Sequence, residues 1–177
     1  MSAMVSGRGL YVWISGLIVA LDQVAKALVD RYMDLHESRS IVDGLARLTY
    51  VQNRGAAFGI LSDADLPYQS LLFSAISILA LGAIAFYAWK LPAGSRLPQL
   101  ALAFIMGGAA GNLLDRARLG YVIDFVDVYW GRHHWPAFNV ADSAITIGVC
   151  LLVLDILKNP QGEPAAELPS PSGARSE

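Results

Sequence analysis

Four long apolar stretches constrain this chain more than any other feature of its sequence. They cover approximately residues 10–29, 68–89, 97–114 and 140–157 in a chain of 177 residues. Each is close to the roughly 20 residues that an α-helix needs to cross the hydrocarbon core of a bilayer. Since an open sheet edge cannot face lipid, these stretches are expected to be helices. The sequence therefore predicts an all-α membrane protein with a four-transmembrane-helix bundle.

The composition agrees with extensive lipid contact. Hydrophobic residues make up 55% of the chain and charged residues only 16%, whereas soluble domains carry about 25% charged residues. The formal net charge of -2 gives no sign of a nucleic-acid partner. The single cysteine, Cys150, lies in an apolar run, so we expect a packed or lipid-facing thiol rather than a nucleophile.

The first apolar stretch is expected to be retained rather than cleaved as a signal peptide. It is longer than the apolar core of a signal peptide, which is about 7–15 residues, and Asp22 and Lys26 interrupt it. These two side chains are one helical turn apart, so they are expected to form an intrahelical ion pair. Asp22 could instead brace another helix across the bundle.

The connections between the apolar stretches differ in length. Residues 90–96 form a short basic turn, whereas the connections 30–67 and 115–139 are long. Four spans place both chain ends on the side of the short turn. Cations favour the cytoplasmic side, but the long connections carry more of them, so charge alone leaves the orientation open. We expect one domain over 1–158 and a proline-rich, disordered tail over 159–177.

The long connections contain strand-like segments. Residues 45–51 are rich in β-formers, and 56–60 follow a turn at 53–55. Apolar and polar residues alternate in part of 120–130, which favours a short strand. A small sheet on the membrane surface is therefore predicted.

Polar residues at the end of the third apolar stretch are candidates for a site. Gly107 and Gly111 have the spacing that lets helix backbones approach closely. Gly108, Asn112 and Arg116 are four residues apart and lie on one helical face. This face could serve only helix packing, with a cation favoured by the helix C-terminus, or it could carry a functional site.

Two aspartates are the candidate catalytic groups. Asp124 lies among apolar neighbours, where desolvation should raise its pKa; Asp127 is a rival that we interpret as structural or solvated. Asn139 or Asp142 is expected to cap the fourth helix, whose N-terminus would keep Asp142 ionised. A water between Asp124 and Asp142 could be deprotonated by one carboxyl while the other protonates the scissile amide. Sequence cannot assign the shared proton.

Other chemistries fit less well. No H-E-x-x-H motif is present, and the adjacent His133 and His134 would point to opposite faces of an extended segment, so no metal or cofactor is predicted. There is no G-x-S-x-G elbow, and Ser143 is expected in the first turn of a helix. A small transporter or a non-catalytic scaffold that binds lipidated peptides remains an alternative.

Five segments in register resemble one known family. The chain closely resembles the lipoprotein signal peptidases (signal peptidase II), the membrane aspartic peptidases of bacteria, over about residues 10–158. The segments are DQVAK at 22–26, NRGAAFG at 53–59, GGAAGNLLDR at 107–116, GYVIDFVD at 120–127 and FNVADS at 138–143. A minor departure is Ala110, where the family often has leucine.

The resemblance implies an activity and a set of site residues. The family cleaves the signal peptide of a diacylglyceryl-modified prolipoprotein just before the lipidated cysteine, without metal or cofactor. Its catalytic pair corresponds to Asp124 and Asp142. The other implied roles are substrate-binding or supporting for Asn53, Gly108, Asn112, Arg116 and Asn139, and structural for Asp22 and Lys26.

The resemblance also implies an architecture and a location. The family has four helices, a small periplasmic β-cradle and a loop that covers the site. It resides in the bacterial inner membrane with both termini in the cytoplasm and the active site near the outer face. Membrane lipid and the cyclic peptide inhibitor globomycin are the implied further partners, and the chain is expected to be a monomer.

Overall fold

Four helices and a small sheet make up the computed structural model, which describes residues 2–55, 68–92 and 94–159. The helices are α1 (Ser2–Tyr32), α2 (Gln69–Lys90), α3 (Arg96–Leu119) and α4 (Val140–Lys158). All four are long and apolar enough to cross a membrane, which confirms the predicted bundle. The predicted strand 56–60 and all but the first residue of the predicted tail 159–177 lie outside the described residues.

The third helix is longer than predicted. The apolar stretch ends at about residue 114, but α3 continues to Leu119, and four of the five added residues, Arg116, Ala117, Arg118 and Leu119, form helices well. Gly120 then ends it in the left-handed conformation, with a φ of 82°, and its N–H donates to the carbonyl oxygen of Arg116. The extra turn carries Asp115 and Arg116 toward the sheet.

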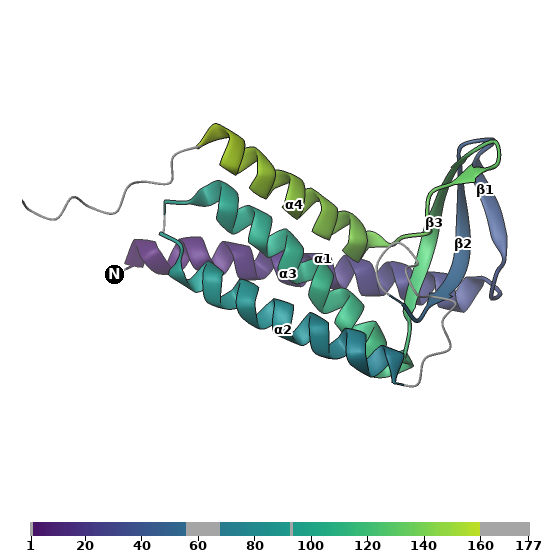
Figure 1. Cartoon of the computed structure of the whole chain (residues 1–177), viewed down its shortest axis with the longest axis horizontal. Helices are drawn as coiled ribbons and strands as arrows, with labels where there is room; N and C mark the ends of the chain where they lie inside the picture. Colours follow the sequence, from purple (N-terminus) through teal and green to yellow (C-terminus); the bar gives the residue numbers. More distant parts are fainter. Residues whose placement is uncertain (1, 56–67, 93, 160–177) are drawn as a thin grey trace, which may run out of the picture.

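The two ends of the bundle differ (Figure 1). The N-terminus, the connection between α2 and α3, and the end of α4 lie at one end, and the sheet lies at the other. Within the bundle, α3 packs against each of the other three helices. Glycines permit this: a Cβ built on Gly107 would lie 2.9 Å from the Cβ of Ile18 in α1, and one on Gly108 would lie 2.3 Å from the carbonyl oxygen of Ala141 in α4.

The sheet has four antiparallel strands in the order β1-β2-β3-β4. They are β1 (Ser38–Val42), β2 (Ala46–Asn53), β3 (Val122–Trp130) and β4 (His133–His134). Alternate side chains of β3 serve different surroundings. Ile123 and Phe125 join a buried cluster with Val29, Met33 and Tyr50, whereas Val122 and Asp124 line a cavity.

The start of α4 is tied to β3 through the backbone. The N–H of Val126 donates to the carbonyl oxygen of Phe138 at 2.8 Å, and the N–H of Phe138 donates to that of Val126 at 3.0 Å. Asn139 therefore emerges beside Asp124. A strand pairing of this kind explains how residues 124 and 142, from different elements, reach one site.

Candidate active site

Asp124 is a buried acid on β3 whose two carboxyl oxygens both accept hydrogen bonds. Asn53 donates from Nδ2 to Oδ2 at 2.9 Å, and Asn139 donates from Nδ2 to Oδ1 at 2.7 Å. Only 2% of the residue is exposed. Burial, followed by the nearby negative charge of Asp142, raises the pKa of Asp124 to about 7, although both amide hydrogen bonds oppose the rise.

Asp142 lies in the first turn of α4, and its oxygens are likewise engaged. Asn112 donates from Nδ2 to Oδ1 at 2.8 Å, and the backbone N–H of Asn139 donates to Oδ2 at 3.3 Å. The N–H of Asp142 in turn donates to Oδ1 of Asn139 at 2.9 Å. The predicted helix cap is therefore a reciprocal capping box, and the cap residues also contact the candidate acids.

One cavity of about 200 Å³ brings the two acids together. Its walls come from α2, α3, α4 and the ends of β2 and β3. Asp124 and Asp142 both line it, together with Asn53, Asn112, Arg116, Phe73, Ile76, Ser77, Ala80, Ala109, Val122 and Ile145. The cavity thus combines apolar walls with a few polar groups, the pattern of a site that binds and orients a ligand.

Arg116 holds the end of β2 against α3. Its Nη2 donates to the carbonyl oxygen of Gly55 at 2.9 Å, and its guanidinium lies 5.8 Å from the centre of the Phe73 ring. Its buried Nε has no hydrogen-bond partner among the described residues. These described contacts fit the supporting role that the family resemblance implies for Arg116.

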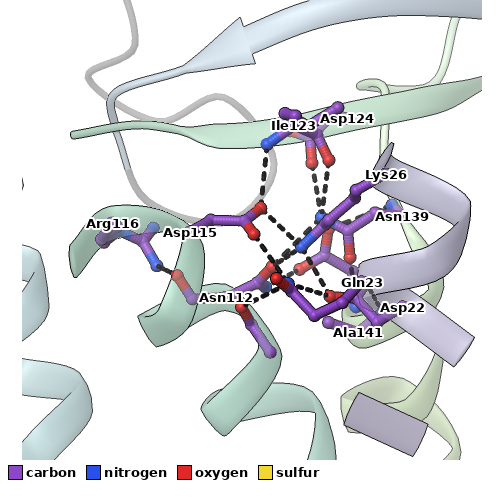
Figure 2. Close-up of polar contacts among 12 residues, drawn as sticks. Asp22, Gln23, Lys26, Asn112, Asp115, Arg116, Ile123, Asp124, Asn139 and Ala141 are labelled. Atoms are coloured by element: carbon purple, nitrogen blue, oxygen red, sulfur yellow. Dashed lines mark hydrogen bonds and ion pairs between the residues drawn. The ribbon is translucent and has the colours of Figure 1, made fainter. Parts of the chain in front are cut away.

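A buried charged cluster lies beside Asp124 and Asn139 (Figure 2). Lys26 Nζ is 2.8 Å from Asp22 Oδ2 and 2.8 Å from Asp115 Oδ2. The expected ion pair within α1 is present, and Asp22 also braces the bundle, because its Oδ1 accepts a hydrogen bond from the N–H of Ala141 at 2.9 Å. Gln23 joins the cluster by donating to Asp115 Oδ1 at 2.8 Å.

Sequence reasoning missed the roles of Asp115 and Gln23. Asp115 is only 3% exposed and also accepts a hydrogen bond from the N–H of Ile123 at 3.2 Å. The available signal was a lone acid in the last turns of α3, where the helix macrodipole disfavours an anion. Such a residue needs a cation, and Lys26 supplies it.

The remaining candidates lie away from the cavity. Gly108 does not line it; its lack of a side chain lets α3 approach Ala141 of α4. Asp127 pairs with Arg47 at 2.6 Å and with His134 at 3.1 Å, as its structural interpretation predicts. Among the described residues, no group of three or more His, Cys, Asp or Glu side chains is placed to hold a metal ion.

Comparison with known proteins places the chain in a family. The family model for signal peptidase (SPase) II matches residues 14–158, which include every residue that lines the cavity. The chain belongs to the signal peptidase II family. A signal peptidase II is an aspartic peptidase that acts on lipoprotein precursors, so the chain is a membrane-embedded hydrolase.

Curated signal peptidase II relatives match over most of their length. The lipoprotein signal peptidase of Geobacter sulfurreducens is 54% identical over 140 residues, which cover 79% of this chain and 86% of the relative. That of Geobacter metallireducens is 49% identical, over 82% of this chain and 89% of the relative. That of Pseudomonas aeruginosa is 38% identical, over 90% of this chain and 95% of the relative.

Solved structures agree with the signal peptidase II assignment at the level of the fold. A bacterial membrane enzyme solved at 2.3 Å resolution superposes with a TM-score of 0.77 and 32% identity, covering 90% of this chain and 94% of that one. A second, solved at 1.9 Å resolution, has a TM-score of 0.75 and 29% identity, with 85% and 94% covered. The helix bundle with its terminal sheet is therefore shared.

Proposed function

We propose that this chain removes the signal peptide from diacylglyceryl-modified prolipoproteins, cutting just before the lipidated cysteine with a water activated by Asp124 and Asp142. The observation that carries the proposal is the cavity that both acids line, with Asn139 contacting each of them. Two carboxyls in unequal surroundings can divide the roles of acid and base.

The chemistry needs one proton on the pair. With a pKa of about 7, Asp124 holds a proton below that pH while Asp142 accepts one from water. The hydroxide so formed adds to the scissile carbonyl carbon as Asp124 protonates the carbonyl oxygen or the leaving amine. Where the carbonyl oxygen has been protonated, Asp142 passes the proton taken from water to the leaving nitrogen, and Asp124 takes a proton back from a hydroxyl of the tetrahedral intermediate. Collapse of the intermediate breaks the C–N bond and releases a carboxylic acid and an amine, and the pair again holds one proton. The proton belongs to the coupled pair rather than to one residue.

The three asparagines hold the acids in this scheme. Asn53 and Asn139 direct their amide groups at Asp124, and Asn112 directs its amide at Asp142. These donors are therefore engaged before a peptide binds. Arg116 is different, because its buried Nε has no partner among the described residues and is available to a substrate carbonyl oxygen that enters the cavity.

The place of the cavity suits a lipidated substrate. Its lining includes Asn53, Val122 and Asp124 of the sheet together with apolar side chains of α2 and α4. The sheet lies at one end of the bundle (Figure 1), so a cleavage site anchored by acyl chains reaches the cavity from the bilayer surface. We assign the chain to the bacterial inner membrane with the sheet on the outer face and both termini in the cytoplasm. A monomer suffices for this site, and a globomycin-type inhibitor would compete for the same cavity.

The test is cleavage of a diacylated prolipoprotein by the detergent-purified chain, followed by mass spectrometry. We expect Asp124→Asn and Asp142→Asn to abolish the mass shift while thermal unfolding remains cooperative. Asp43→Asn, a change at an exposed acid in the β1–β2 turn, is the matched control and should cleave normally. Near-normal cleavage by either of the first two variants overturns the mechanism, and binding without turnover by the unmodified chain supports the scaffold alternative.

A further inference from the structure

Lys26 uses all of its donors inside the bundle. The residue is 2% exposed, and its ammonium group is 2.8 Å from an oxygen of each of three side chains, Asp22, Asp115 and Asn112. A lysine ammonium has three protons to donate and no acceptor. Two of the three acceptors are carboxylates, which already supply more negative charge than one cation neutralises. The third acceptor, Asn112, is uncharged and therefore needs another explanation.

Asn112 connects this cluster to the candidate catalytic pair. Its Oδ1 accepts from Lys26 Nζ at 2.8 Å and from Asn139 Nδ2 at 3.2 Å, while its Nδ2 donates to Asp142 Oδ1 at 2.8 Å. If the Asn112 amide were rotated by about 180°, its NH₂ group would face the two donors, Lys26 Nζ and Asn139 Nδ2, and its oxygen would face the carboxylate of Asp142. Buried donor–donor contacts of this kind leave polar groups unsatisfied, which is costly.

The orientation of Asn139 is set in the same way by a different donor. Its Oδ1 accepts from the backbone N–H of Asp142 at 2.9 Å, so its Nδ2 is left for Asp124 and Asn112. Figure 2 shows Lys26, Asn112, Asn139 and Asp124 gathered in one network. Within this network, Lys26 is the charged donor that faces the oxygen of Asn112.

We propose that Lys26 is a positioning residue for the reaction: its ammonium group holds the oxygen of Asn112 and so keeps the NH₂ group of that amide directed at Asp142. This inference rests on the proposed function, because it gives a purpose to a hydrogen bond on one of the two proposed catalytic acids. A purely structural ion pair needs Asp22 and Asp115 but has no need of Asn112.

A double-mutant cycle on kcat tests the inference. Its variants are Lys26→Gln, Asn112→Leu and the two combined. We expect Lys26→Gln to lower kcat on the order of 100-fold, the loss typical of a displaced catalytic group, with KM changed far less. If Lys26 acts through Asn112, the combined variant should be no slower than Asn112→Leu alone. Losses that multiply would mean that Lys26 acts independently, and would overturn the inference.

Ser15→Ala provides the matched control. Ser15 also links α1 to α3, because its hydroxyl donates to the carbonyl oxygen of Ala103 at 2.9 Å, and its described hydrogen bonds join it neither to Lys26 nor to the two carboxylates that pair with Lys26. Any loss of kcat that it causes through weakened packing should multiply with that of Asn112→Leu. A non-additive result for this pair would show that the cycle reports general destabilisation, and would equally overturn the inference.

A second background guards against a variant that fails to fold. Lys26→Gln leaves two buried carboxylates without their cation, so the same cycle is also run with Asp115→Asn present throughout. Each Lys26→Gln variant then lacks one positive and one negative charge of the cluster. Losses of kcat that multiply, or that do not, are interpreted as in the first cycle. If the proposed function is wrong, Asp142→Asn will still cleave the substrate. If Asp142→Asn is inactive but the kcat losses of Lys26→Gln and Asn112→Leu multiply, only the role of Lys26 is contradicted.

Discussion

Asn139 and Asp142 cap each other at the start of α4. The N–H of Asp142 donates to Asn139 Oδ1 at 2.9 Å, and the N–H of Asn139 donates to Asp142 Oδ2 at 3.3 Å. The same Asn139 side chain donates to Asp124 Oδ1 at 2.7 Å. The capping role and the proposed catalytic role are therefore not alternatives, because the cap is what sets the two acids beside each other.

Replacing Asn139 by alanine should affect stability and activity together. The loss of an N-cap side chain costs about 1–2 kcal/mol of folding free energy, and the loss of a donor to Asp124 should lower kcat on the order of 10-fold to 100-fold. Thermal unfolding in detergent and the cleavage assay measure the two effects. Ser143→Ala, which removes a hydroxyl that donates to the Asn139 carbonyl oxygen, is the control. If Asn139→Ala were destabilised but kept a normal kcat, Asn139 would serve only as the helix cap and would have no role in catalysis.

The pH dependence of cleavage should show an alkaline limb. Asp124, with a pKa of about 7, is protonated below that pH and ionised above it. Since the reaction needs one proton on the pair, kcat should fall as the pH rises through about 7. The apparent value belongs to the coupled pair. A rate that stays flat from pH 6 to pH 9 would contradict this assignment.

The same limb can be moved by changing a hydrogen bond. Asn53 donates to Asp124 and thereby favours the ionised carboxylate, which lowers its pKa. In Asn53→Ala the pKa of Asp124 should rise further, so the alkaline limb should shift to higher pH although kcat itself falls. A shift to lower pH would show that the Asn53 contact does not act on this carboxyl.

Gly108→Ala should force α3 and α4 apart. The added methyl group would meet the carbonyl oxygen of Ala141 at 2.3 Å, and overpacking of this kind costs about 1–3 kcal/mol. Cleavage should fall as well, because Asp142 follows Ala141 directly on α4. Gly82→Ala in α2 is the matched control, since nothing lies within 4 Å of its added methyl. Equal melting temperatures for the two variants would contradict the close contact seen between the helices.

Much of this site could be predicted from local patterns. The four helices follow from apolar length alone, and Asp124 stood out as an acid among apolar neighbours. The α4 cap was visible in the residues just before an apolar run. These signals are local, because hydrophobic length and helix capping each depend on a few neighbouring residues.

Partnerships between distant residues could not be predicted in this way. The contact of Lys26 with Asp115 joins α1 to α3, and that of Arg47 with Asp127 joins β2 to β3; neither pair has a local pattern. The role of Gly108 was only half visible, because its spacing predicts a flat face but does not name Ala141 as the group that meets it. Such contacts depend on how the helices and strands pack in three dimensions.

Asp127→Asn should keep nearly full activity. Although Asp127 lies three residues after Asp124, its carboxyl pairs with Arg47 and His134 on the sheet and does not line the cavity. Its loss should lower the melting temperature slightly, since the pair with half-exposed Arg47 contributes about 1 kcal/mol or less. Asp124→Asn is the paired variant and should be inactive. If Asp127→Asn were the inactive one, the catalytic pair would have to be reassigned.

The orientation in the membrane can be tested with single cysteines. In a Cys150→Ala background, Asp43→Cys places a thiol in the exposed turn between β1 and β2, and Gly94→Cys places one in the exposed connection between α2 and α3. The turn between β1 and β2 and the connection between α2 and α3 lie at opposite ends of the bundle (Figure 1), so the bilayer should separate the two thiols. In intact spheroplasts, a membrane-impermeant maleimide should label Asp43→Cys but not Gly94→Cys, and both should react after detergent lysis. The opposite pattern would place the sheet and the cavity in the cytoplasm, where a precursor cleaved at the outer face could not reach the two acids.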